Sequence, residues 1–520
     1  MEILTSDVVS SLKKSHKNRK AFKILVVIAS YGSKNDPYLH RVIDEYKGMR
    51  YHCEIVVLSN IQKDLGENIE VVVGLPSKNP HSLPYNYQKV FKDRIDCYDL
   101  FIYTEDDVLI TENNITSFLE LIEILPENEV PGFTRFEVDP IGNKYFEPIH
   151  SHFYWRPDSV KTINGETFAF FTNEHSGCHI LTKSQLKKLM ASTNYFIEPS
   201  EGFYGMLEMA ATAPYLIKGF KKMICLTRID DFAVHHLPNT YIYKWGAESA
   251  EVKIQINALK QIEMEKRPNC RLFETYTRLA HPKWNKSNYE PCRYDMIEVM
   301  PKEIKSVISI GCGWGATEAE LIKRNIKVVA IPIDAAIGAC AEAKGVPILT
   351  PDFDIAAREL GKEKYDCLLI SEVLHHLPDP VKILRQYTKY LINEGYVVIG
   401  VPNFNHVSIW HKQYLGATLF RDLRYIGNFE KSGLQYSTYG NVNRWMRRSG
   451  FKLMSVHNGE ITLTPSRKEN LPWQGGLKAL QRLRKRLRPE TRIGRMSLRL
   501  INTWLSPNIV MVGKRVSNGK

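Results

Sequence analysis

Short apolar runs alternate with amphipathic segments along the first half of this chain. They predict strands at Lys23–Ala29, Glu54–Ser59, Glu70–Val73 and Leu100–Tyr103, and a helix at Pro37–Tyr46. Strands that alternate with helices form a sheet covered by helices. We therefore expect an α/β domain over residues 1–245.

The same alternation returns in the last third of the chain. The pattern predicts a helix at Tyr294–Met300, strands at Val328–Ile331 and Tyr365–Ile370, and a final strand at Asn508–Gly513. Between the two patterned regions, residues 246–288 are polar, first helical and then irregular. We expect them to form a partly helical linker to a second α/β domain at 289–520.

Three glycines follow the apolar run Val307–Ile310 at every second position: Gly311, Gly313 and Gly315. Glycine allows the backbone to turn sharply after a strand and allows a ligand to lie against bare peptide. The predicted helix Ala316–Arg324 begins directly after the turn and directs its first N–H groups toward the same place. The pattern predicts a cofactor pocket.

A second stretch, Tyr365–Pro380, contains a buried strand followed by Ser371-Glu372-Val-Leu-His375-His376-Leu-Pro. Together with the glycine turn, this order resembles class I S-adenosylmethionine-dependent methyltransferases over about residues 290–460. The resemblance implies a Rossmann-like, seven-stranded sheet and S-adenosylmethionine as cofactor. It also implies that the donor is bound by the three glycines of the turn, by Asp352 and Phe353 beside the adenine, and by Glu372.

One position departs from that family. Its members usually carry an acidic residue at the end of the second strand, where it binds both ribose hydroxyls, but Pro332 stands there in this chain. A proline side chain neither donates nor accepts a hydrogen bond. Asp334, two residues later, points to the same side of an extended chain, and we expect it to replace the missing carboxylate. If it does not, the domain is a degenerate scaffold.

Methylation of a hydroxyl needs a base, because an alcohol is a poor nucleophile until its proton is removed. His375 and His376 follow the strand that borders the expected substrate pocket. We take both as candidate catalytic residues, with a purely structural histidine as the alternative for His376.

The first half contains its own charged motif, because the apolar run Leu100–Tyr103 leads to Glu105, Asp106 and Asp107. Burying neighbouring carboxylates is costly unless a cation compensates them. Oxygen ligands favour Mg²⁺ or Mn²⁺, which also bridge to diphosphates. The alternative is an ordinary solvated acidic turn.

This strand and its acidic end resemble GT-A glycosyltransferases, in which an Asp-x-Asp motif ends a strand. Here Glu105 replaces the first aspartate. The resemblance implies a nucleotide-sugar donor and a metal held by Glu105 and Asp107, with His235 or His236 as a last ligand. Glu208 and Glu201 are candidate bases for the sugar acceptor, and we prefer Glu208.

Composition adds two limits. The 520 residues are 43% hydrophobic and 24% charged, as in ordinary globular proteins, and the nine cysteines contain no Cys-x-x-Cys pair. We expect a cytoplasmic protein with reduced thiols, without a signal peptide or a transmembrane helix.

The net charge of +13 is concentrated in residues 466–500, which carry eleven basic residues and two glutamates. Leu477, Leu480, Leu483 and Leu487 lie on one face of a helix there. A basic amphipathic helix fits the anionic inner face of the cell membrane, although a solvated helix is an equal alternative. We do not expect nucleic acid as a partner.

These observations predict a bifunctional enzyme that transfers a sugar and a methyl group to a glycan, such as a bacterial surface polysaccharide or its lipid-linked precursor. The alternative is a methyltransferase whose first domain binds carbohydrate without catalysis.

Overall fold

The computed structural model describes residues 22–191, 195–199, 204–216, 219–244, 246–279, 282–406, 409, 423–459 and 506–516. The contacts divide the chain into two compact units. The first is Met1–His150 with Ser159–Val252, and the second is Ser151–Asp158 with Lys253–Lys520. The second unit therefore includes a short stretch from the first half and most of the segment that we expected to be a linker. Glu201 and the basic segment 466–500 lie outside the described residues.

The strands of the first unit form three sheets. The largest has the order β11-β4-β1-β2-β3, in which β1 is parallel to β2 and β4, and only β11 is antiparallel. Its strands are β1 Lys23–Ser30, β2 His52–Ser59, β3 Ile69–Val73, β4 Leu100–Glu105 and β11 Cys178–Thr182. Ile24–Ile28 are completely buried, as is typical of a central parallel strand. The strands expected in this half are confirmed.

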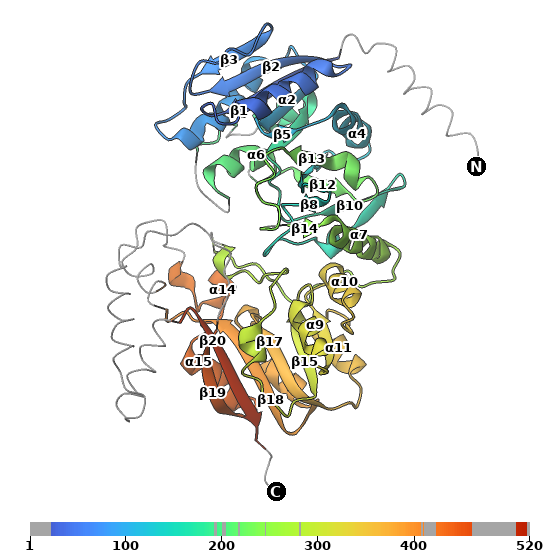
Figure 1. The fold of residues 1–520 in the computed structure, drawn as a ribbon, viewed down its shortest axis with the longest axis vertical. Helices are drawn as coiled ribbons and strands as arrows, with labels where there is room; N and C mark the ends of the chain where they lie inside the picture. Colours follow the sequence, from blue (N-terminus) through green and yellow to red (C-terminus); the bar gives the residue numbers. More distant parts are fainter. Residues whose placement is uncertain are drawn as a thin grey trace, which may run out of the picture. The chain divides into compact units, whose positions relative to one another are not determined.

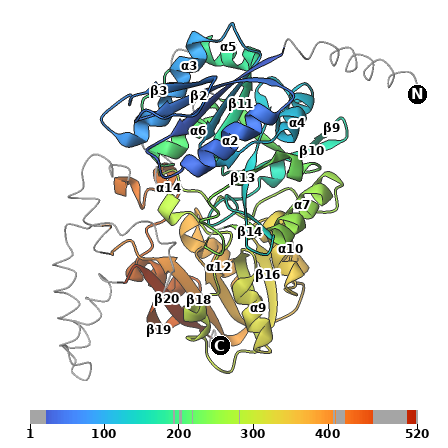
Figure 2. The same cartoon turned by 45° about the horizontal axis from the view of Figure 1, so that its top comes forward.

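Two smaller sheets complete this unit, with the orders β14-β8-β7-β13-β5 and β6-β12-β10-β9. Their strands are β5 Val108–Leu109, β6 Glu129–Pro131, β7 Thr134–Val138, β8 Lys144–Phe146, β9 Lys161–Ile163, β10 Glu166–Phe170, β12 Lys221–Cys225, β13 Ala233–His236 and β14 Ala247–Glu248. The α-helices are α2 Asp36–Gly48, α3 Tyr87–Asp93, α4 Glu112–Ile122, α5 Lys183–Ala191 and α6 Met206–Leu216, and α7 Ser249–Glu263 leads into the second unit. Helix α2 contacts β5, and it also contacts β2, which is labelled near it in Figure 2.

The second unit contains one mixed sheet with the order β16-β15-β17-β18-β20-β19 (Figure 1). Its first four strands are parallel, and β20 runs antiparallel between β18 and β19. The strands are β15 Ser306–Cys312, β16 Lys327–Pro332, β17 Tyr365–Ser371, β18 Leu391–Pro402, β19 Phe451–Gly459 and β20 Asn508–Arg515. The α-helices are α8 Tyr294–Ile297, α9 Ala316–Lys323, α10 Ala335–Ala343, α11 Phe353–Glu359, α12 Pro380–Thr388, α14 Phe429–Ser432 and α15 Tyr439–Arg448. The Rossmann-like α/β fold is confirmed for this unit.

The expected seventh strand is absent from the described part of this sheet. In its place a single bridge joins Ala330 of β16 to Ile348. Pro347 and Pro351 flank the bridge, and proline has no N–H to donate to a ladder. The two prolines thus explain why the edge strand is reduced to one pairing.

Among the residues with described structure, no helix is long and apolar enough to cross a membrane.

Candidate functional site

The glycine turn of the second unit lies between β15 and α9, at the carboxyl edge of the sheet, as the sequence predicts. Gly311 and Gly315 have φ values of +80° and +85°. A Cβ at Gly311 would lie 2.2 Å from Cγ2 of Val373, and one at Gly315 would lie 2.6 Å from Cβ of Ala341. Contacts within the chain therefore require both glycines.

Gly313 faces another part of the same unit, Asn288. A Cβ at Gly313 would lie 2.2 Å from the Asn288 carbonyl oxygen. The backbone N–H of Trp314 donates to that oxygen over 3.0 Å, and the indole N–H of Trp314 donates to the Glu290 carbonyl over 2.6 Å. The chain itself thus covers the bare backbone on which we expected a ligand.

Asp334 has a structural role in this conformation. Its Oδ1 accepts hydrogen bonds from the N–H groups of Ala336 and Ile337 and caps α10, while Oδ2 lies 2.5 Å from Nη1 of Arg271. The side chain is 1% exposed. Burial raises the pKa of Asp334, and Arg271 opposes this effect. Both oxygens of Asp334 thus have partners in this conformation, and binding of the ribose hydroxyls by Asp334 stays a prediction.

Asp352 also caps a helix, since its Oδ1 accepts from the N–H groups of Asp354 and Ile355 at the start of α11. Its neighbour Phe353 lines a cavity of about 460 Å³, whose other walls include Phe273 and His376. This volume lies within the range of small-molecule sites. The structure thus brings Phe353 and His376, two of the predicted site residues, to one cavity.

His375 and His376 lie in a short 3-10 turn after β17 and are 1% and 3% exposed. Burial lowers the pKa of His376 to about 3 and that of His375 well below its ordinary value. Within the described residues neither ring nitrogen of His376 has a hydrogen-bond partner, although the backbone of Trp284 is near. Both imidazoles are therefore neutral, and the His376 ring lines the cavity while both of its nitrogens are buried.

Glu372 directly follows β17 and lies in the left-handed region, with φ +54°. Burial raises the pKa of Glu372 to about 7, although Nη1 of Arg293 lies 3.5 Å from its Oε1. Positive φ in a residue other than glycine is strained and is often found at functional sites.

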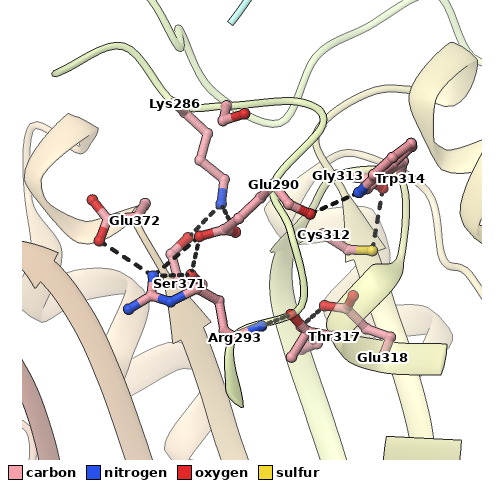
Figure 3. Close-up of polar contacts among 12 residues, drawn as sticks. Lys286, Glu290, Arg293, Cys312, Gly313, Trp314, Thr317, Glu318, Ser371 and Glu372 are labelled. Carbon is pink, nitrogen blue, oxygen red and sulfur yellow. Dashed lines mark hydrogen bonds and ion pairs between the residues drawn. The ribbon is translucent and has the colours of Figure 1, made fainter. Parts of the chain in front are cut away.

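A network of charges fills the space beside Glu372 (Figure 3). Glu290 lies 2.6 Å from Nζ of Lys286 and 3.1 Å from Nη1 of Arg293. Burial alone would raise the pKa of Glu290, but the two cations lower it to about 2. Lys286 also donates to the carbonyl oxygen of Ser371 over 2.9 Å.

The residues of this edge fit S-adenosylmethionine only in part. The cavity beside Phe353 has room and an aromatic wall for the adenine. The glycine turn is covered by Asn288, and the carboxylate of Asp334 is paired with Arg271. In this conformation the turn and the ribose position do not accept the cofactor.

The acidic turn of the first unit is partly buried. The side-chain amide of Asn35 donates to Asp106 over 2.9 Å and to Asp107 over 3.2 Å. Burial raises the pKa of Glu105 to about 8 and that of Asp106 to about 6. Nη1 of Arg135 lies 3.8 Å from the Glu105 carboxylate, and His236 also favours its charged form, but Arg135 is bound more closely by Glu147 at 2.8 Å.

His236 belongs to this cluster and His235 does not. Nε2 of His236 lies 3.6 Å from Asp107, and its Nδ1 lies 2.6 Å from Glu137. Burial alone would lower the pKa of His236, but these carboxylates raise it to about 9. His235 instead contacts Asn239 and stacks on Phe136.

Glu208, in the first turn of α6, is close enough for its charge to raise the pKa of Glu105. The structure therefore brings Glu105, Asp107, His236 and Glu208 together. Over the described ranges, however, no three acidic, histidine or cysteine side chains are already arranged to hold a metal ion.

Sequence reasoning missed the residues that bind these charges: Arg135, Glu137 and Asn35 in the first unit, and Arg271, Lys286, Asn288, Glu290 and Arg293 in the second. Only the alternation in β7 gave a signal, since it places Arg135 and Glu137 on one face of the strand, where both are buried, opposite the half-buried Phe136 and Val138.

Comparison with known proteins identifies the second unit. Residues 265–456 match a family model described as a methyltransferase domain. A ubiquinone biosynthesis O-methyltransferase of Chromobacterium violaceum is 25% identical over 204 residues, which are 35% of this chain and 84% of that protein. A second, from Hydrogenovibrio crunogenus, is 24% identical over 165 residues, 29% of this chain and 68% of the relative.

Among solved structures, a SAM-dependent methyltransferase from Archaeoglobus fulgidus is 16% identical and covers 41% of this chain and 87% of its own, with a TM-score of 0.28. That score does not by itself establish a shared fold. The family match lies outside residues 1–264, so the glycosyltransferase interpretation of the first unit stays a prediction. The chain therefore contains a class I S-adenosylmethionine-dependent methyltransferase domain at residues 265–456.

Proposed function

We propose that the second unit is an O-methyltransferase that transfers a methyl group from S-adenosylmethionine to a hydroxyl. The observation that carries this proposal is the cavity at the carboxyl edge of the sheet, which Phe353 and the neutral His376 both line. The two relatives named as O-methyltransferases favour a hydroxyl acceptor over an amine.

The protein must orient the hydroxyl and accept its proton, while the donor supplies an electrophilic methyl group. His376 accepts a hydrogen bond from the acceptor hydroxyl because its imidazole is neutral. With a pKa of about 3 it is a weak base, so it orients the hydroxyl more than it removes the proton. The proton would then pass to water in the cavity, since Glu372, whose pKa burial raises to about 7, is not among the described residues that line it.

The experiment compares His376→Ala with the full-length wild type. We expect kcat to fall about 10²-fold, while the Kd of S-adenosylhomocysteine changes less than about twofold. Acceptors with sugar hydroxyls and acceptors with phenolic hydroxyls are tested side by side. An unchanged kcat with both classes contradicts a role for His376.

We infer a glycan as the acceptor from a second proposal, that the first unit is a metal-dependent glycosyltransferase. The raised pKa values of Glu105 and Asp106 favour it, since Mn²⁺ or Mg²⁺ would compensate these carboxylates. Glu208 would deprotonate the sugar acceptor. Nucleotide-sugar hydrolysis with and without Mn²⁺ distinguishes this proposal from a non-catalytic carbohydrate-binding unit.

We further propose that the protein acts in the cytoplasm and that its basic segment 466–500 contacts an anionic membrane surface. Binding of the full chain to vesicles with and without anionic lipid tests this contact.

A further inference from the structure

Residues 286–290 cross the glycine turn of the second unit, and we call them the strap. We propose that the strap is an autoinhibitory contact that residues 151–153 hold in place, and that the methyl donor binds only after the strap has moved off the turn. The inference rests on the proposed methyltransferase function.

The strap takes the position of a ligand on the turn. The carbonyl oxygen of Asn288 accepts the Trp314 N–H and lies where a Cβ of Gly313 would stand. The Trp314 amide has only one hydrogen, which it already donates to Asn288. The Asn288 carbonyl also covers the surface that the missing side chain of Gly313 leaves open. A donor molecule therefore cannot use this amide and this surface while Asn288 is there.

Charges fix both ends of the strap. Lys286 is fully buried and reaches from one end to Glu290 at the other and to Ser371 at the end of β17 (Figure 3). Arg293 and Ser371 Oγ also contact the Glu290 carboxylate, at 3.1 Å and 2.8 Å. These contacts make the strap an ordered element of the closed conformation.

The middle of the strap is held by a separate segment, Ser151–Phe153. The side-chain amide of Asn288 donates to the carbonyl oxygens of His152 and Phe153 over 3.0 Å and 3.3 Å. The Asn288 N–H and the Ser287 hydroxyl both donate to the carbonyl of Ser151, over 2.8 Å and 3.1 Å. In the sequence, Ser151–Phe153 follow β8 and precede β9. The residues that hold the strap therefore come from a connection between two strands of the first unit.

One buried polar atom of the strap lacks a hydrogen bond within the described part of the closed conformation. Oδ1 of Asn288 is buried and has no hydrogen-bond partner among the described residues. Such a group makes a conformation less favourable than one in which water can reach it. Hydrogen bonds and charges thus hold the strap in place, while the buried Oδ1 of Asn288, which has no partner in the described structure, favours its opening.

The test measures binding of S-adenosylhomocysteine to the full-length protein by calorimetry. Asn288→Ala removes the two hydrogen bonds to residues 152 and 153, and Ser287→Ala removes the one to Ser151. We expect Asn288→Ala to tighten binding about tenfold and Ser287→Ala to tighten it less. Ser449→Ala is the matched control, because it removes a buried hydroxyl before β19, at the opposite edge of the sheet, and we expect it to leave the Kd unchanged.

Amide exchange gives a second measurement that does not depend on a variant. We expect S-adenosylhomocysteine to speed exchange at the Asn288 amide of the wild type, because that amide leaves the Ser151 carbonyl when the strap opens. Tighter binding by the strap variants, or this faster exchange, supports the inference. Weaker or unchanged binding by both variants, or protection of the Asn288 amide, overturns it and leaves the methyltransferase proposal intact. If neither wild type nor variants bind, both proposals fail.

Discussion

The two units differ in how they treat charges at the carboxyl ends of their parallel strands. In the first unit, Glu105 and Asp106 are buried with too few cations, and their pKa values rise to about 8 and 6. In the second unit, Glu290 is buried between Lys286 and Arg293, and its pKa falls to about 2.

This difference separates a site in which carboxylates outnumber the nearby cations from one in which the chain pairs a carboxylate with two cations. A cation brought by a ligand would relieve the first cluster. In the second unit the chain has paired the charges and covered the turn, so a ligand must displace existing contacts. Under our two proposals, the first site would bind a metal ion and the second would have to open before it binds its ligand.

The largest effect that tests the comparison is expected in the first unit. Asp107→Asn removes a carboxylate from the cluster and should lower sugar transfer more than ~10³-fold, because metal and phosphate positioning would be lost. Radiolabelled nucleotide-sugar assays with Mn²⁺ measure this change.

Asp96→Asn is the matched control, since Asp96 is exposed and pairs only with surface lysines. It should retain full activity. S-adenosylhomocysteine binding should be the same in both variants. Equal sugar transfer by Asp107→Asn and Asp96→Asn would contradict the proposal that the first unit binds a cation.

The next effect concerns the paired charges of the second unit. Glu290→Gln leaves Lys286 buried without a counter-ion and should lower the free energy of unfolding by about 3 kcal/mol. This is the low end for a broken buried pair, because Glu290 is 15% exposed.

The pH dependence of the free energy of unfolding tests the same ion pair, because the lowered pKa of Glu290 sets the pH range in which the pair stabilises the fold. The folded pKa of Glu290, about 2, lies below its ordinary value of 4.5. Its stabilisation is therefore complete above about pH 4.5 and is lost as the pH falls toward 2. Urea unfolding of wild type and Glu290→Gln should give midpoints that converge on acidification. A constant difference down to pH 2.5 contradicts the pairing.

The smallest effect tests whether residues 151–158 stabilise the second unit. The guanidinium of Arg271 lies 3.4 Å from the ring centroid of Tyr154. Tyr154→Leu should lower the free energy of unfolding of the second unit by about 2 kcal/mol. Tyr154→Phe retains the ring and should stay within a few tenths of a kcal/mol. Equal losses in both variants, measured by thermal unfolding, would assign the effect to the hydroxyl instead.

Local patterns predicted most of the fold. The expected strand Tyr365–Ile370 differs by one residue from β17, and the glycine turn begins α9 as its spacing requires. The position of Phe353 on a cavity also follows from the order of strands. The prediction of a seventh strand was wrong because it followed the family pattern alone. Pro347 and Pro351, which are visible in the sequence, disfavour a strand there.

Local sequence patterns could not predict that Asn288 covers the glycine turn. Asn288 and Arg271 stand in a stretch with weak periodicity, and their partners are 26 and 63 residues further on, at Trp314 and Asp334. Only packing in three dimensions selects these pairs. The same is true of His152 and Phe153, which contact Asn288 across more than 130 residues of chain.

The assignment of Ser151–Asp158 to the second unit also affects how the protein is made. These residues leave the ribosome well before Lys286–Glu290, so the first unit must finish around a loop whose own neighbours have not yet been synthesised. A fragment that starts at Lys253 would lack this loop permanently, and for expression a circularly permuted or co-expressed form that restores it is the sounder choice.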